Sequence, residues 1–314
     1  MEWRSLPEIL DAEQLIELAL HRAAKKRSGQ SDSAARKLSS LADNLGAPLG
    51  AIVEKFPSLD QLHPFDHDIV NLSVGLDELR QSLGGIDWAR KQLQKLGGQF
   101  SSKAARARGE RALQLQKQGY GRLTSVVRQV SDRLEFLRNA RKTLGLLPAV
   151  DPETPLAVMA GAPNVGKSSL VRAISTGRPA VREYPFTTKS VSLGHITARY
   201  QKLQVMDTPG LLDRPDAQRN NIEKHGLAAL EHLSPSIMFV TDGSGTSGYP
   251  IEGQQTLREE LRQRFPDAHW LDIWSKCDME QEKSLPEGAL ATSATEETGV
   301  AELKQTVIEM LLPE

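Results

Sequence analysis

The chain lacks several features that mark particular classes of protein. It has a single cysteine, Cys277, among 314 residues, so no intramolecular disulfide can form and a disulfide-stapled secreted fold is excluded. No group of Cys and His residues has the spacing of zinc ligands, which excludes a structural zinc domain. No apolar run approaches the roughly 20 residues that a membrane-spanning helix needs. Residues 1–10 carry charged side chains where a signal peptide would be apolar, and we therefore expect a cytoplasmic protein.

Aromatic residues are also few, at 5% of the chain. The hydrophobic content of 39% is nevertheless ordinary for a folded protein and too high for a disordered one. At about 150 residues per domain, this length predicts two domains that can each bury a core. A proline-containing linker separates them, and we expect one domain at residues 1–148 and the other at residues 149–314.

The net charge of −1 conceals two halves of opposite sign. Positions 1–150 hold 23 basic and 17 acidic side chains, whereas positions 151–314 hold 16 and 23. From Arg80 to Lys142 there are 15 basic side chains and only 4 acidic ones. A basic half favours a polyanionic partner. The alternative is that Lys and Arg simply solvate the outer faces of long helices.

The N-terminal half has the periodicity of helices. Asp11 is the predicted N-cap of a first helix, with Gln14 three residues later as a loose capping box. Another helix is expected from about Asp66, and Gly84-Gly85 should break or bend it. Further on, apolar residues recur at i, i+3 and i+4 and form one stripe: Leu123, Val126, Val127, Val130, Leu134 and Leu137. These patterns predict an antiparallel helical bundle with a basic exterior.

The pattern of apolar residues changes after the linker. Short apolar runs now alternate with helical segments, and the predicted strands are Leu156–Met159, Leu203–Met206, Ile237–Val240 and Trp270–Trp274. Strands that alternate with helices imply βαβ units and a buried sheet. The second domain is therefore expected to be α/β, with a mostly parallel sheet flanked by helices.

A phosphate-binding loop opens the second domain. The run from Gly161 to Ser168 fits G-x-x-x-x-G-K-[ST], and it follows a predicted strand and precedes a predicted helix. Glycines let successive N–H groups point at phosphate oxygens, and Lys167 places a cation between the β- and γ-phosphates. The residues predicted to bind the phosphates are Gly161, Ala162, Pro163, Asn164, Val165, Gly166, Lys167, Ser168 and Ser169.

A second motif supports a nucleoside triphosphate. Asp207 begins an Asp-Thr-Pro-Gly run about 40 residues after the loop, directly behind a predicted strand. An acidic residue there can hold Mg²⁺ through water, while the Ser168 hydroxyl ligates the ion directly. The N–H of Gly210 is placed to sense the γ-phosphate. The pair of motifs predicts a triphosphate bound with Mg²⁺.

A third motif indicates guanine. Residues 275–278 read Ser-Lys-Cys-Asp, and Asp278 can accept both N1–H and the 2-amino group of guanine. The Lys276 stem can lie over the base, and the N–H of Ala294 can reach the guanine oxygen. Guanine-specific proteins usually have Asn where this chain has Ser275, whose shorter side chain is expected to lose reach to the base edge and the P-loop. The predicted guanine-site residues are Ser275, Lys276, Asp278, Ser293, Ala294 and Thr295.

The chain lacks the glutamine that orients the attacking water in many such GTPases, because Leu211 follows Gly210. Intrinsic hydrolysis is therefore expected to be slow unless another group positions the water. Asn164 is a candidate to bind a monovalent cation such as K⁺ beside the phosphates. The alternative is that Asn164 only shapes the loop. Arg182 and Arg214 are other candidates to supply positive charge.

These motifs, taken together, resemble those of a known family. The run Tyr184–Lys189 resembles the first switch of the Obg-HflX superfamily of GTPases, and within it the chain is most similar to the nucleolar GTP-binding protein (NOG) family. Residues 207–215 support this in the second half of the chain. The supporting runs in the first half are Phe56-Pro57, Pro64-Phe65, Val74–Leu79 and Gly84–Ala89.

The resemblance implies a helical bundle followed by a G domain, with a role in assembling the large ribosomal subunit through rRNA contacts. It implies that Thr188 joins Ser168 and Asp207 at the Mg²⁺ site. The residues expected to act in hydrolysis are Lys167, Thr188, Gly210 and Asn164. The basic excess gains a candidate ligand in rRNA, through Lys103, Arg106, Arg108, Arg128, Arg138 and Lys142. The chain is short for this family, which favours an archaeal or otherwise prokaryotic member in the cytoplasm.

Two other functions stay open. One is a regulator that acts on mature ribosomes, as other members of the superfamily do. The other is a mostly structural rRNA-binding scaffold, in which Ser275 and the missing glutamine mark a weak GTPase. The leading hypothesis is a GTP-dependent assembly factor, in which GTP orders the switches and hydrolysis releases them.

Overall fold

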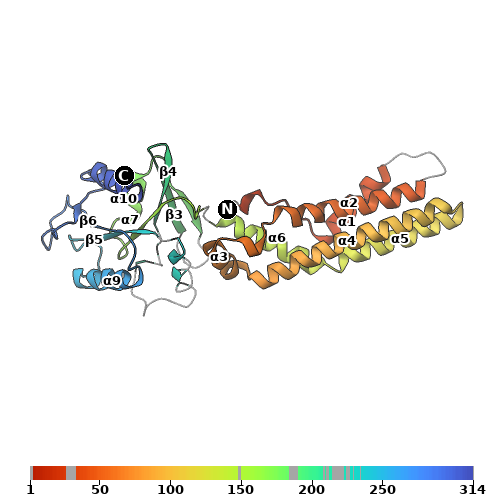
Figure 1. Cartoon of the computed structure of the whole chain (residues 1–314), viewed down its shortest axis with the longest axis horizontal. Helices are drawn as coiled ribbons and strands as arrows, with labels where there is room; N and C mark the ends of the chain where they lie inside the picture. Colours follow the sequence, from red (N-terminus) through yellow and green to blue (C-terminus); the bar gives the residue numbers. More distant parts are fainter. Residues whose placement is uncertain are drawn as a thin grey trace. The chain divides into compact units, whose positions relative to one another are not determined.

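The computed structural model describes residues 3–25, 33–147, 150–183, 190–207, 209, 212–213, 223, 227–228, 230–233 and 235–313. The chain forms two compact units, whose elements are labelled in Figure 1. The helical unit comprises Glu2–Gln61 and Val74–Gly145, and the α/β unit comprises chiefly Leu62–Ser73 and Leu146–Glu314. This division differs from a single boundary near residue 148 in one segment, because residues 62–73 belong with the α/β unit.

The helical unit is all-α, as predicted. Its long helices are α1 (Ala12–Lys25), α2 (Ser33–Lys55), α4 (Leu76–Arg106), α5 (Glu110–Arg128) and α6 (Ser131–Leu146). Two short 3₁₀ turns, η1 (Trp3–Ser5) and η2 (Leu59–Gln61), complete it. Figure 1 shows α4 and α5 running side by side.

The predicted start of α1 is confirmed in detail. The N–H of Gln14 donates to Asp11 Oδ1 at 2.9 Å, and the N–H of Asp11 donates to Gln14 Oε1 at 3.2 Å. These two bonds form a reciprocal capping box, which satisfies N–H groups that the first turn would leave unpaired. The apolar stripe is confirmed as well, since all six of its residues from Leu123 to Leu137 are buried, although the chain changes helix within it.

The helix break expected at Gly84-Gly85 is wrong, and the alternative of a bend there stays a prediction. Helix α4 runs through both residues, and the chain instead breaks at Gly75, whose φ of 79° separates α3 (Pro64–Val74) from α4. Gly85 has a packing role, because a Cβ there would overlap the Arg133 side chain from α6. A glycine in a helix can mark the close approach of a neighbour as well as an end.

The α/β unit is built on one seven-stranded sheet with the order β2-β3-β4-β1-β5-β6-β7. The four predicted strands correspond to β1 (Leu156–Ala160), β4 (Gln201–Asp207), β5 (Ser236–Asp242) and β6 (Trp270–Ser275). Three further strands were not predicted: β2 (Ala180–Glu183), β3 (Ser190–Ala198) and β7 (Leu290–Ala291). Four strand pairs are parallel, and only β2–β3 and β3–β4 are antiparallel. The mostly parallel sheet is thus confirmed.

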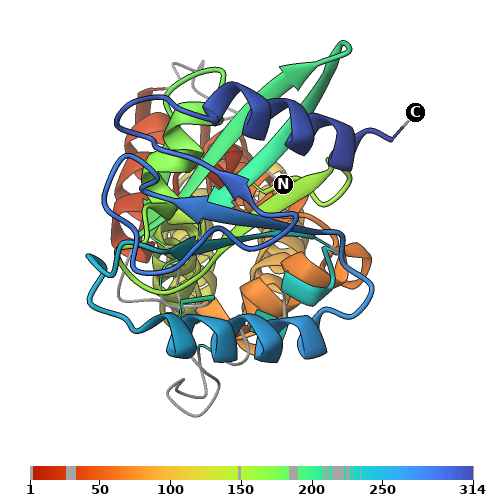
Figure 2. The same ribbon diagram turned by 90° about the vertical axis from the view of Figure 1, so that its left-hand side faces the viewer.

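Helices cover both faces of the sheet. Figure 2 shows α10 (Val300–Leu311) along one face and α9 (Ile251–Arg264) along the other. Helix α7 (Lys167–Ile174) shares a core with α10, in which Leu170 and Leu303 pack with buried residues of the central strands. Strand β1 lies between β4 and β5, so that β2–β4 lie on one side of it and β5–β7 on the other, and the strand order reverses at β1. In open α/β sheets, ligands bind at the carboxyl ends of strands beside such a point.

Helix α3 packs with the α/β unit although its sequence neighbours lie in the helical unit. His232 Nε2 lies 3.2 Å from Asp68 Oδ2, which links α3 to the segment that precedes β5. Burial raises the pKa of Asp66, on the same helix. No helix in the part of the chain that the structure describes is long and apolar enough to cross a membrane.

Candidate nucleotide site

The loop between β1 and α7 has the backbone of a phosphate cradle. Gly161 has a φ of 135°, and a Cβ there would lie 2.3 Å from the carbonyl oxygen of Val240. Asn164 and Gly166 also have positive φ, at 61° and 101°. No described side chain caps the first turn of α7, so its N–H groups are left for an anion. The glycines of the motif are therefore required by geometry.

Lys167 lies inside this loop. Its side chain is only 6% exposed, and its ammonium donates to the carbonyl oxygens of Gly161 and Ala162, both at 2.8 Å. These bonds hold the charge at the mouth of the loop, where the β- and γ-phosphates of a nucleotide would lie.

The Ser168 hydroxyl and the buried carboxylate of Asp207 meet across the loop. Ser168 Oγ donates to Asp207 Oδ2, and Asp207 is 1% exposed at the carboxyl end of β4. A hydroxyl paired with a carboxylate is the donor set that holds Mg²⁺ in P-loop proteins, so these residues fit the ion. Two other predicted residues, Thr188 and Gly210, lie outside the described part of the chain.

A cavity of about 400 Å³ opens over the loop. It is lined by residues of the P-loop and of the segment after β4: Pro163, Asn164, Gly166, Lys167, Ser168, Ser169, Asp207, Pro209 and Asp213. Gly161 and Ala162 are buried and do not line it. Of the predicted Mg²⁺ residues, the structure thus brings Ser168 and Asp207 to the same cavity as the P-loop. Asp213, which is not among the predicted site residues, also lines this cavity.

A second cavity, of about 290 Å³, adjoins the first and shares Gly166 and Ser169 with it. All the predicted guanine-site residues line its wall: Ser275, Lys276, Asp278, Ser293, Ala294 and Thr295. They come from two loops, one after β6 and one after β7. Because β6 and β7 are parallel neighbours, their carboxyl ends place both loops at the same edge of the sheet.

Ser275 behaves differently from the expectation. Its hydroxyl lies 2.7 Å from the carbonyl oxygen of Val165 in the P-loop and 3.1 Å from that of Thr241. The expected loss of reach to the P-loop is therefore wrong. Ser275 is only 3% exposed at the end of β6, and the P-loop approaches closely enough for a short side chain to hold it.

Asp242, which was not predicted as a site residue, holds Lys276 in the guanine region. Lys276 Nζ lies 2.8 Å from both Asp242 Oδ2 and Thr246 Oγ1. Burial would raise the pKa of Asp242, but hydrogen bonds from Lys276 and Ser244 outweigh it and hold the pKa below its usual range. The sequence does contain a signal for Asp242, because it is an acidic residue at the end of strand β5, where it pairs in register with Ser275 of β6.

The six candidate rRNA-binding residues do not share one environment. Lys103 and Arg106 in the last turn of α4, and Arg108 in the connection to α5, are exposed, and within the described chain they have no ion-pair partner. We call these three residues the hairpin tip. By contrast, Arg128 forms a two-pronged ion pair with Glu13. Arg138 Nη1 lies 3.5 Å from Asp11 Oδ2 in a second ion pair, whereas Lys142 is exposed.

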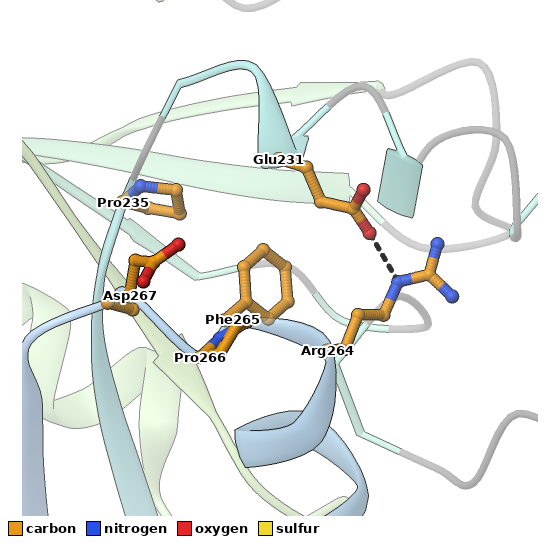
Figure 3. Close-up of a pocket in the computed structure, with 7 residues that line it drawn as sticks. Glu231, Pro235, Arg264, Phe265, Pro266 and Asp267 are labelled. Atoms are coloured by element: carbon orange, nitrogen blue, oxygen red, sulfur yellow. Dashed lines mark hydrogen bonds and ion pairs between the residues drawn. The ribbon is translucent and has the colours of Figure 1, made fainter.

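A third cavity, of about 200 Å³, lies where β5 and β6 begin, and Figure 3 shows its lining. Arg264 Nε donates to Glu231 Oε1 at 2.5 Å across one side of it. None of the predicted site residues lines this cavity. The nucleotide cavities lie at the carboxyl ends of the parallel strands, so this cavity is at the opposite edge of the sheet.

Comparisons with known proteins agree with this geometry. Residues 3–151 match the NOG1 N-terminal helical domain, and residues 157–270 match the 50S ribosome-binding GTPase family. A protein of Methanocaldococcus jannaschii is 33% identical over 275 residues, which cover 84% of this chain and 77% of that protein. The chain belongs to the NOG family.

Other NOG relatives are longer. Nucleolar GTP-binding protein 1 of Encephalitozoon cuniculi is 32% identical, over 89% of this chain and 55% of its own length. The Candida glabrata protein of that name is 29% identical, over 96% and 48%. The chain thus spans about half the length of these NOG proteins. A crystal structure of a Plasmodium falciparum relative covers 52% of this chain and 90% of its own, at 29% identity and a TM-score of 0.46.

Proposed function

We propose that this NOG-family chain binds GTP, hydrolyses it slowly, and uses that cycle to control its binding to rRNA in assembling large ribosomal subunits. One observation carries the proposal: among the described residues, those predicted for the phosphate, Mg²⁺ and guanine sites line two adjoining cavities at the carboxyl ends of the parallel strands. The matches to a ribosome-binding GTPase family and to a NOG helical domain support the ribosomal part.

The proposed nucleotide contacts follow from the geometry. The N–H groups of the P-loop and the Lys167 ammonium bind the phosphates. Ser168 and Asp207 hold Mg²⁺, which supplies neutralisation of the charge that develops on the phosphates, and Thr188 completes that site by resemblance. Asp278 pairs with the guanine edge and Ala294 with its oxygen, while GDP keeps the same base contacts.

Hydrolysis is proposed to be slow because Leu211 has no polar group to orient water. Asn164 is exposed and lines the phosphate cavity, so its side chain is a candidate to bind a cation there. We propose K⁺ as that cation. Replacing Asn164 with Ala should abolish the stimulation of GTP hydrolysis by K⁺ over Na⁺, measured at matched ionic strength. Stimulation that survives this replacement would exclude the role.

The proposed rRNA surface is the hairpin tip, with Lys142 as a further contact. Its charges are exposed, whereas Arg128 and Arg138 are engaged by acidic residues of the same unit. Unpaired cations on an exposed turn suit a phosphate backbone. The names of the eukaryotic relatives place those proteins in the nucleolus. The cytoplasmic location expected for this chain stays a prediction.

The experiment is co-sedimentation of the purified chain with large-subunit precursor particles and with mature subunits. Each is measured with a non-hydrolysable GTP analogue, with GDP and without nucleotide. The proposal predicts that the analogue gives the strongest binding and that precursors are preferred. A Lys167→Ala variant is the control, because it should lose the nucleotide effect while keeping the helical unit.

The same measurement separates the alternatives. Equal binding to mature and precursor particles would instead assign the chain to regulation of mature ribosomes. Binding that ignores nucleotide, together with hydrolysis equal to that of Lys167→Ala, would assign a structural scaffold. Absence of binding under all conditions would contradict any ribosomal role.

A further inference from the structure

The phosphate cavity contains a second acidic side chain that the nucleotide contacts do not use. Asp213 lines this cavity and is only 4% exposed. Its Oδ1 is buried, and none of the described residues donates a hydrogen bond to that atom. A buried carboxylate oxygen in this state is costly, because the group loses its hydration without replacement. A ligand that enters the cavity with a donor of its own would relieve that cost.

The backbone fixes where Asp213 lies along the cavity. The carbonyl oxygen of Leu212, the preceding residue, accepts a 2.9 Å hydrogen bond from the N–H of Gly161. Gly161 is the first residue of the P-loop, and its carbonyl accepts from the Lys167 ammonium. Asp213 is therefore held at the end of the cavity where the ammonium marks the β- and γ-phosphates, away from the guanine cavity, whose lining does not include it.

Electrostatics then restrict what Asp213 can contact. A carboxylate next to a triphosphate repels it, and burial strengthens that repulsion. Direct contact between Asp213 and a phosphate oxygen is thus unfavourable. A water molecule between them resolves the conflict, because one O–H donates to the carboxylate while its oxygen faces the phosphorus. In many GTPases a glutamine holds such a water, and this chain has Leu211 at that position.

We propose that the Asp213 carboxylate orients the water that attacks the γ-phosphate, in place of the missing glutamine. In this step the water oxygen forms a bond to the γ-phosphorus as the bond to the β,γ-bridging oxygen breaks. GDP leaves with that electron pair, and the proton that the water gives up passes to the inorganic phosphate. Asp213 remains a carboxylate throughout and acts by alignment. The inference rests on the proposed GTPase activity.

Single-turnover GTP hydrolysis by the full chain tests this role, with Asp213→Asn and Asp213→Ala. We expect the rate to fall about 100-fold in both variants. Affinity for GDP and for a GTP analogue should stay within about threefold of the original, since the carboxylate contacts only water. Asp267→Asn, an exposed change at the opposite edge of the sheet, is the matched control and should leave the rate unchanged.

A second readout separates alignment of water from support of the loop. Aluminium fluoride with GDP mimics the transferring phosphoryl group together with its in-line water. The original chain should form this complex, and both Asp213 variants should lose it while still binding GDP. Hydrolysis that persists in both variants would overturn the inference, as would a parallel loss of GDP affinity, because that loss would show a structural role.

Two controls keep this result distinct from others. If the unmodified chain hydrolyses GTP no faster than the Lys167→Ala variant, the GTPase proposal and the inference are both refuted. If it hydrolyses GTP faster than that variant, and Asp213→Asn keeps the same rate, only the inference is refuted. A rate loss in Asp213→Asn that high K⁺ concentrations restore would also overturn it, since Asp213 would then hold a cation.

Discussion

At the scale of single residues, the nucleotide site depends on short side chains that bridge backbone segments. Ser275 contacts the P-loop carbonyl of Val165 and so joins the guanine loop to the phosphate loop. Lys276 is fixed by Asp242 and Thr246, which aligns its stem along the guanine cavity wall. The two nucleotide cavities therefore form one continuous site, and a change at Ser275 should affect both.

Ser275→Ala should weaken the binding of GDP and of a GTP analogue about tenfold. The change leaves the carbonyl oxygen of Val165 without its side-chain donor, and an unmet buried group costs about 1–3 kcal/mol. Titration with a fluorescent guanine nucleotide measures this effect, and Ser284→Ala, an exposed position, is the matched control. Equal affinity in Ser275→Ala and the control would show that the contact does not support binding.

At the scale of elements, glycines set how closely the long helices approach. A Cβ on Gly97 in α4 would lie 2.3 Å from the Cβ of Ala42 in α2, and neither group can turn aside. The neighbouring Gly98 is exposed, and a Cβ there would meet no atom within 4 Å. Gly97 thus allows α4 and α2 to pack closely, whereas Gly98 makes no such contact and only lowers the stability of the helix.

Replacing each glycine with Ala should change stability in opposite directions. Gly97→Ala should lower the free energy of unfolding by about 1–3 kcal/mol through overpacking, partly offset by better helix propensity. Gly98→Ala should raise it by about 0.5–1 kcal/mol. Urea unfolding followed by circular dichroism measures both. A shift of the same sign in the two variants would contradict the packing of α4 against α2.

At the scale of the whole molecule, two units with different charge and different chemistry share one chain. The helical unit holds the basic excess, and the α/β unit holds the nucleotide site. Helix α3 is the exception to the sequence order, because it is part of the α/β unit while its neighbours along the chain belong to the helical unit. The chain therefore passes between the units more than once.

The hairpin tip should control the salt dependence of RNA binding. Changing Lys103, Arg106 and Arg108 to Gln should reduce the slope of log affinity against log salt by about 2 to 3, because each phosphate contact contributes about 0.7–0.9. Filter binding to large-subunit rRNA at several salt concentrations measures the slope. A matched triple change of exposed cations in the α/β unit, at Arg172, Arg178 and Lys202, should leave it unaltered. Equal slopes in the two triple variants would refute the assignment.

Features that depend on local chemistry could be predicted from the amino-acid sequence. The P-loop, the capping box at Asp11 and the four central strands could be predicted because each needs particular residues at fixed spacing. The order of the motifs also indicated the edge of the sheet at which the nucleotide binds. Strands β2 and β3 escaped prediction, since they lie toward a sheet edge and carry no uniform apolar run.

Contacts between groups far apart in the sequence could be known only from the folded chain. The pattern at Gly85 predicts a helix break, but in the fold Arg133 of α6 lies against this glycine inside α4. The short side chain of Ser275 reaches the P-loop because the loop lies beside it. Asp213 lies in the run 207–215 that resembles the family, but only the folded chain shows that its side chain is buried in the wall of the phosphate cavity. Such features depend on the approach of segments far apart in the chain, and spacing along a sequence does not encode that distance.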